Sequence, residues 1–201
     1  VYFAKNMLEA RGESLKGKKC TVSGSGNVSI YTIEKLYHLG ALPITCSDSS
    51  GMILDEEGID LELLKDLKEN QRARLTEYVK YRKNAKYIPV DSYPKGRNAV
   101  WSVPCFAAFP SATQNELNIE DAKELIKNGC VCVSEGANMP STNEAVDFFV
   151  AQKIAYGPGK AANAGGVATS QLEMAQNASM VSWTFEEVDA KLEKIMKHIF
   201  D

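Results

Sequence analysis

Glycine and serine residues with the spacing G-x-G-x-x-S follow a short apolar run near the start of the chain, in the stretch CTVSGSGNVS. Gly24 would permit a sharp turn, Gly26 would let the backbone approach a diphosphate, and the small Ser29 replaces the usual third glycine. The N-terminus of the helix that follows offers free N–H groups and a dipole that favours phosphate. Because the turn joins an apolar strand to an amphipathic helix, we predict a dinucleotide-binding site and not a plain tight turn. Its predicted contacts are Gly24, Ser25, Gly26, Asn27 and Val28.

Asp48 ends the next apolar run, ALPITCSD, and bears on which dinucleotide binds. A carboxylate in this place accepts hydrogen bonds from the adenosine ribose and repels a 2′-phosphate, which favours NAD. Ser49 and the neighbouring serines could instead donate hydrogen bonds to a phosphate. Positive charge on the segment beyond, at Lys68, Arg72 and Arg74, also favours NADP. The same cations could form the solvated face of a helix, so these residues leave NAD and NADP equally open.

The elements that must position these residues follow from the pattern of apolar runs. Runs rich in valine and isoleucine alternate with stretches of helical period, which is typical of βαβ units. We expect a strand at 41–48, a long charged helix at 59–81, further strands at 85–90 and 101–110, and a capping box at 184–187. The predicted fold is α/β: a Rossmann-like, doubly wound, mostly parallel sheet flanked by helices.

Composition and charge limit the class of protein. The chain has 201 residues, of which 44% are hydrophobic, and this length suits one large domain. Its net charge of −3 and its lack of an apolar stretch near the roughly 20 residues of a membrane span favour neither nucleic acid nor a membrane as partner. Five cysteines without a repeated pair spacing indicate reduced thiols, and with only two histidines we predict no metal site. These features predict a cytoplasmic protein.

Five motifs occur in order along the chain: SGSGNV, SDSSG, ATQNEL at 112–117, EGANMPSTNEA at 135–145 and PGKAANAGGVATSQLEMAQN at 158–177. Over almost the whole chain they resemble the cofactor domain of glutamate dehydrogenase, and they are most similar to its microbial, hexameric, NADP-dependent branch. The resemblance implies an NAD(P)-dependent amino-acid dehydrogenase that acts on a CH–NH2 group. The implied reaction is reversible hydride transfer between NADP(H) and glutamate, or 2-oxoglutarate plus ammonia. A homo-oligomer is implied for the full-length protein.

The resemblance also implies roles for particular residues at the cofactor. Asp48 and Ser49 match positions at the adenosine ribose, and Lys68 matches a lysine at the 2′-phosphate, which favours NADP with NAD as the alternative. Side-chain amides offer both a donor and an acceptor, so they can fix the nicotinamide carboxamide and select one ring face. Taken singly, each such amide could instead begin a helix, cap one or shape a loop. The amides that match this half of the cofactor are Gln114, Asn115 and Asn138, with Asn163 as a second candidate.

Ser170 matches the serine that helps to bind the side-chain carboxylate of the substrate, although it could equally be an ordinary surface hydroxyl. The family's catalytic lysine and aspartate belong to an amino-terminal substrate domain without a match here. Lys160 lies in the cofactor domain, so no catalytic residue is predicted in this chain. We therefore expect residues 1–201 to be the dinucleotide-binding domain of a larger dehydrogenase, with closing helices at 167–201 partly appended. Such a chain would bind cofactor without turning over substrate.

Phe106 departs from the family pattern, which usually has aspartate at this position. An aromatic ring cannot accept the hydrogen bonds of a carboxylate. We therefore expect a rearranged strand end close to the nicotinamide pocket.

Two other functions stay open at this point. A related dehydrogenase that acts on leucine, phenylalanine or valine would share these motifs, but Ser170 would then have no ionic group to hold. A non-catalytic dinucleotide-binding module that folds alone would fit the lack of a catalytic lysine equally well.

Overall fold

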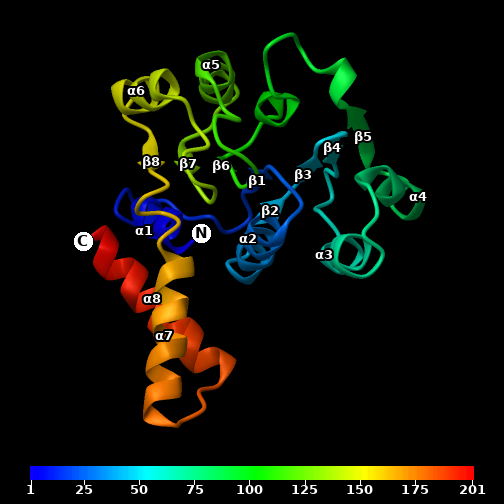
Figure 1. Ribbon diagram of the computed structural model, residues 1–201. Helices are drawn as coiled ribbons and strands as arrows, with labels where there is room; N and C mark the ends of the chain where they lie inside the picture. Colours follow the sequence, from blue (N-terminus) through cyan, green and yellow to red (C-terminus); the bar gives the residue numbers. More distant parts are fainter.

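A five-stranded parallel sheet forms the centre of the computed structural model, which describes residues 1–201 (Figure 1). The strand order is β2-β1-β6-β7-β8, and every neighbouring pair is parallel. The chain passes from β1 to β2 on one side and returns to β6 on the other side, so the strand order reverses at β1. This arrangement confirms the predicted Rossmann-like fold. The strands are β1 (Lys19–Val22), β2 (Leu42–Pro43), β6 (Ala107–Phe109), β7 (Cys132–Ser134) and β8 (Ala155–Gly157).

Helices cover both faces of this sheet, because alternate strand residues point to opposite sides. The helices are α1 (Tyr2–Glu9) and α2 (Asn27–His38) on one face, and α5 (Ile119–Lys127) and α6 (Asn143–Ala151) on the other (Figure 1). Val22 and Phe109 belong to the apolar cluster that contains residues of α1 and α2. Ala108 and Val133 belong to a second cluster with α5 and α6. The sheet is therefore doubly wound, with an apolar layer on each side.

A second, antiparallel sheet was not predicted. It consists of β3 (Thr45–Asp48), β4 (Gly51–Leu54) and β5 (Lys86–Pro89), in that order. The strand expected at 41–48 is divided, because β2 pairs with β1 whereas β3 pairs with β4. β3 still runs beside β1, since the Thr45 hydroxyl bonds both the N–H and the carbonyl of Val22, at 2.9 Å and 3.0 Å.

The prediction of one long helix at 59–81 is wrong. The segment forms α3 (Leu61–Lys65), a π-helical turn (Asp66–Asn70), a 3₁₀ turn (Leu75–Glu77) and α4 (Tyr78–Tyr81). Leu64, Leu67, Leu75 and Tyr78 are nevertheless buried and Leu61 is partly buried, so the segment still packs its apolar side against the core. The break has a tertiary cause: the N–H of Leu75 donates to the Asp48 carboxylate at 3.1 Å, and a continuous helix would have used that N–H internally.

Two helices close the chain: α7 (Gly165–Ser179) and α8 (Phe185–Phe200). Figure 1 shows the pair extending away from the parallel sheet, with α8 returning toward α1. There Phe3 meets Phe200 edge-to-face at 5.7 Å, and Lys35 on α2 pairs with Asp189 at 2.7 Å. The predicted capping box at the start of α8 is present. No helix of the protein is both long and apolar enough to cross a bilayer.

Candidate functional site

The glycine-rich turn lies directly after β1. Gly24 has φ +82°, and a Cβ there would lie 2.3 Å from the Ser29 hydroxyl oxygen and 3.1 Å from the Ser111 carbonyl. Ser29 is fully buried, and its hydroxyl donates to the carbonyl of Ser23 at 2.7 Å and faces that of Ser111 at 3.2 Å. The third position therefore tolerates serine because its small side chain finds acceptors in the tight contact between helix and strands.

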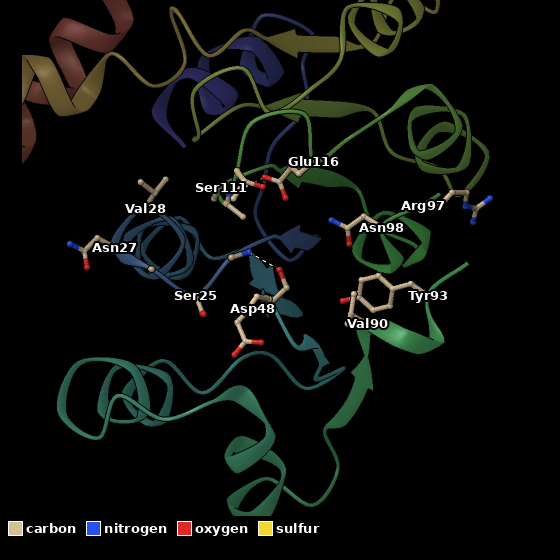
Figure 2. A pocket seen from close by; sticks show the side chains of 16 residues that line it. Ser25, Asn27, Val28, Asp48, Val90, Tyr93, Arg97, Asn98, Ser111 and Glu116 are labelled. Carbon is tan, nitrogen blue, oxygen red and sulfur yellow. Dashed lines mark hydrogen bonds between the residues drawn. The ribbon is translucent and has the colours of Figure 1, made fainter. Parts of the chain in front are cut away.

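The N-terminus of α2 opens into a cavity of about 770 Å³. Gly26 is the N-cap residue, and no side chain caps the helix, so its first N–H groups are available to a ligand. A Cβ on Gly26 would meet nothing within 4 Å. We call this the adenosine-side cavity because Asp48, the predicted ribose contact, lines it. Figure 2 shows Val28 of α2 on one side of the cavity and Val90 and Tyr93 on the other. All five residues predicted at 24–28 line it.

Asp48 also lines the adenosine-side cavity, where its carboxylate is held in place. The N–H and hydroxyl of Ser50 donate to one carboxylate oxygen, at 2.8 Å and 2.5 Å, and the N–H of Leu75 donates to the other. Burial alone would raise the pKa of Asp48, but these hydrogen bonds outweigh it and the pKa is lowered. The Ser47 hydroxyl also has a partner within the protein, because it accepts a hydrogen bond from the Gly24 N–H at 2.8 Å. Ser49 is the exposed serine of this stretch.

Two of the three predicted cations lie close to Asp48 and Ser49. The Lys68 ammonium is 3.8 Å from the Asp48 carboxylate and donates to the Ala73 carbonyl at 3.0 Å. Arg74 donates to the Ser49 hydroxyl at 2.7 Å. Arg72 is exposed and contacts neither of them through a hydrogen bond or ion pair. The structure thus brings positive charge and a hydroxyl together at the end of β3.

A second cavity of about 1080 Å³ collects the predicted amides. Gln114, Asn115, Asn138 and Asn163 all line this amide-side cavity, although they come from three different loops. The Asn163 side-chain NH2 donates to the Asn138 amide oxygen at 2.7 Å. The N–H of Asn115 donates to the Met139 carbonyl at 3.0 Å and joins two of the loops. The two cavities adjoin, since Thr113 lines the first and Gln114 the second.

Ser170 is not brought into either cavity. It lies on α7 and is exposed to solvent. The structure therefore separates this predicted substrate contact from the four amides, and its role stays a prediction.

Two glutamates that line the cavities were not predicted: Glu116, which is half-buried, and Glu135, which is buried. Glu116 accepts from the Ser23 hydroxyl and the Ala112 N–H, both at 2.9 Å, and burial raises the pKa of Glu116. Glu135 accepts from the Tyr156 hydroxyl and from a backbone N–H. A signal existed, because both glutamates stand inside the motifs ATQNEL and EGANMPSTNEA, just after β6 and β7.

The expected effect of Phe106 on the nicotinamide end of its strand is wrong. Phe106 precedes β6, and its N–H donates to the Lys19 carbonyl at 2.8 Å at the start of β1. The Lys18 ammonium lies 5.0 Å from the centre of its ring. Both cavities lie at the other end of the strands, since most of their lining residues follow the carboxyl ends of the strands. The substitution therefore lies away from them.

The position of the cavities defines the class of protein. Open α/β sheets bind their ligands beyond the carboxyl ends of the strands, where the strand order reverses. Here Gly24 follows β1 and Ser111 follows β6, and the two strands are neighbours at the reversal. The fold and its cavities are those of a Rossmann-like nucleotide-binding domain.

Comparison with known proteins identifies the family. A sequence profile of the glutamate/leucine/phenylalanine/valine dehydrogenases matches residues 1–201, and the chain belongs to this family. An NADP-specific glutamate dehydrogenase of Helicobacter pylori strain J99 is 66% identical over 200 residues, which cover 100% of this chain and 45% of that protein. An NAD(P)-specific glutamate dehydrogenase of Xylanibacter ruminicola is 54% identical over 207 residues, 99% of this chain and 44% of that protein.

A solved structure gives the same result. Glutamate dehydrogenase 2 of Plasmodium falciparum superposes with a TM-score of 0.92 at 49% identity, over 100% of this chain and 43% of that one. The chain thus spans less than half the length of the relatives that it matches.

Proposed function

We propose that the chain is the dinucleotide-binding part of an NADP-dependent glutamate dehydrogenase, which interconverts glutamate with 2-oxoglutarate and ammonia. The observation that carries this proposal is the uncapped N-terminus of α2, which opens into a cavity beside the Asp48 and Ser49 cluster and adjoins a second cavity lined by four amides. The 66% identical relative is an NADP-specific glutamate dehydrogenase, which supports both the reaction and the cofactor.

The adenosine-side cavity holds the phosphates and the adenosine ribose. The N–H groups at the start of α2 bind the diphosphate, and the open space at Gly26 lets the ligand approach the backbone. Asp48 and Ser49 contact the ribose. The Lys68 ammonium and the Arg74 guanidinium bind the 2′-phosphate, since each already contacts one of these two residues.

The choice of NADP over NAD follows from how Asp48 is occupied. Both of its carboxylate oxygens accept hydrogen bonds from Ser50 or Leu75, so less of its capacity remains for ribose hydroxyls. Ser49 and the nearby cations then determine the preference. A relative that is 54% identical is NAD(P)-specific, so cofactor preference differs among the similar proteins.

The amide-side cavity orients the nicotinamide. Bound NADP supplies the ring that accepts or donates the hydride, and the protein's contribution is to hold that ring in one orientation. Asn138 and Asn163 are already hydrogen-bonded to each other at 2.7 Å, and Gln114 and Asn115 line the same space. Such amides can donate to and accept from a carboxamide at once.

The substrate and the remaining domains belong to the longer protein. Because the chain covers about 45% of its relative, we propose that the catalytic lysine and aspartate lie in a separate substrate domain. Ser170 contacts the side-chain carboxylate of glutamate, and such a contact would be lost on leucine or valine. The whole protein is proposed to be a homo-oligomer in the cytoplasm that acts on small molecules.

Calorimetric titration of the chain with NADPH and with NADH tests this proposal. We expect NADPH to bind at least about tenfold more tightly, because the 2′-phosphate gains charge-assisted hydrogen bonds. Lys68→Ala and Arg74→Ala should each weaken NADPH and leave NADH unchanged, whereas Arg72→Ala, a matched control for net charge, should change neither ligand. Equal affinities would overturn the NADP assignment, and no binding of either dinucleotide would overturn the function.

A further inference from the structure

Glu135 is a buried carboxylate whose partners are all neutral. It follows β7, and only 3% of its surface is exposed. The Tyr156 hydroxyl donates to one oxygen at 2.9 Å, and the N–H of Gly159 donates to the other at 2.6 Å. Glu135 forms no ion pair in the structure. A buried carboxylate costs stability unless its hydrogen bonds are well made, so these two donors indicate a specific position.

The same contacts join two loops that line the amide-side cavity. A Cβ on Gly159 would lie 2.9 Å from the Ala137 carbonyl and 3.2 Å from a Glu135 carboxylate oxygen, so the two backbones touch. Four residues beyond Gly159, Asn163 donates to the Asn138 amide oxygen at 2.7 Å. The Glu135–Gly159 contact thus holds the loop after β8 against the loop after β7, close to the place where Asn163 and Asn138 meet.

Tyr156, the second hydrogen-bond donor to Glu135, is itself held by packing. Its ring stacks on Phe149 with centroids 5.7 Å apart and an angle of 26°. Burial, followed by the negative charge of Glu135, raises the pKa of Tyr156. The phenol therefore keeps its proton and donates a hydrogen bond to the carboxylate.

We infer that Glu135 is a positioning residue for the nicotinamide half of the cofactor. Its carboxylate fixes the loop that begins at Gly159, and this loop places Asn163 against Asn138 in the amide-side cavity. The inference rests on the proposed dinucleotide function. It gives Glu135 no part in holding the diphosphate, which lies in the other cavity.

The test compares two ligands by calorimetry: NADPH, and 2′-phospho-ADP-ribose, which lacks the nicotinamide ring. Glu135→Leu removes both acceptor oxygens with little change of volume. It should weaken NADPH about tenfold and leave 2′-phospho-ADP-ribose within about twofold of wild type. The separate variant Glu135→Gln should bind NADPH like the wild type. Its amide oxygen can accept from the Gly159 N–H while its NH2 donates to the Tyr156 hydroxyl.

Binding of 2′-phospho-ADP-ribose reports that each variant is folded. If Glu135→Leu does not fold, Tyr156→Phe removes one hydrogen bond, keeps the stacked ring, and should weaken NADPH about threefold without affecting the shorter ligand. Equal losses for both ligands, or no loss for NADPH, would overturn the positioning role. Failure of the wild-type chain to bind either ligand would instead overturn the proposed function, so the two failures can be told apart.

Discussion

The two cavities use different kinds of donor. In the adenosine-side cavity the donors are backbone N–H groups at the start of α2, fixed by the sheet and by the buried Ser29. In the amide-side cavity they are side chains from three loops. Backbone donors suit an anion, for which charge matters most, whereas side-chain amides can distinguish the two faces of a ring. The second arrangement needs additional contacts to hold its loops.

One glutamate at each cavity supplies such contacts: the half-buried Glu116 and the buried Glu135. Glu116 fixes the loop after β6 through the Ser23 hydroxyl and the Ala112 N–H. Glu135 fixes the loop after β8 through Gly159. Each carboxylate is held by neutral donors, so each acts through geometry and not through an ion pair.

Gly24→Ala should have the largest effect and should break the adenosine-side cavity. The new Cβ would lie 2.3 Å from the Ser29 hydroxyl oxygen, at a backbone φ of +82° that alanine rarely adopts. We expect a loss of about 1–3 kcal/mol in the free energy of unfolding, together with loss of both NADPH and 2′-phospho-ADP-ribose binding. Urea unfolding and calorimetry measure the two effects.

Gly26→Ala is the matched control for that variant. A Cβ there meets nothing within 4 Å, and φ is −88°, so stability should stay within about 0.5 kcal/mol of wild type. Binding of both ligands should nevertheless fall about tenfold, because the methyl group occupies the approach of the diphosphate. Unchanged binding would contradict the diphosphate site.

Asp121 should make the stability of the protein depend on pH, and it contacts the wall of the adenosine-side cavity. Its carboxylate accepts from Asn98 N–H at 3.0 Å, and Asn98 lines the cavity. Burial raises the pKa of Asp121 to about 6, above its unfolded value near 4. Protonation therefore favours the folded state, and this contribution is complete below about pH 4 and is lost as the pH rises through about 6.

The variant Asp121→Asn cannot titrate and isolates this contribution. Relative to the variant, the wild-type free energy of unfolding should fall by about 2 kcal/mol between pH 4 and pH 7. Urea unfolding at several pH values measures the difference in free energy of unfolding between wild type and variant. The contributions of the other titrating groups cancel in this difference. A difference that is independent of pH would show that Asp121 keeps an ordinary pKa.

Ser170→Ala should have the smallest effect. The residue is exposed on α7 and lines neither cavity, so NADPH affinity should stay within about twofold of wild type. A larger loss in the calorimetric titration would mean that α7 contacts the cofactor.

Local sequence patterns predicted the elements that depend on neighbouring residues. The turn at Gly24, the helix after it and the parallel strands follow from apolar period and from glycine positions. β4 and the second sheet could not be predicted, because Gly51 is required by the approach of the Ile88 carbonyl, 37 residues further along the chain. The break before Leu75 has the same kind of cause, since its N–H is taken by Asp48.

The candidate site likewise has residues that the sequence predicted and contacts that it could not predict. The motifs predicted the four amides, and the structure places them around one cavity. The contacts of Glu135 could not be predicted, since its partners lie 21 and 24 residues away and meet it only when β8 pairs with β7. Ser170 was assigned from resemblance alone, and it lines neither cavity.

Amide chemical shifts of ¹⁵N-labelled protein test the division between the two cavities most directly. Addition of 2′-phospho-ADP-ribose should shift the backbone N–H signals of Gly26, Asn27 and Val28 and leave the side-chain NH2 signals of Asn138 and Asn163 in place. NADPH should shift both sets. If the α2 signals stay unmoved by either ligand, or the two asparagines respond equally to both, the diphosphate and the nicotinamide do not occupy these cavities.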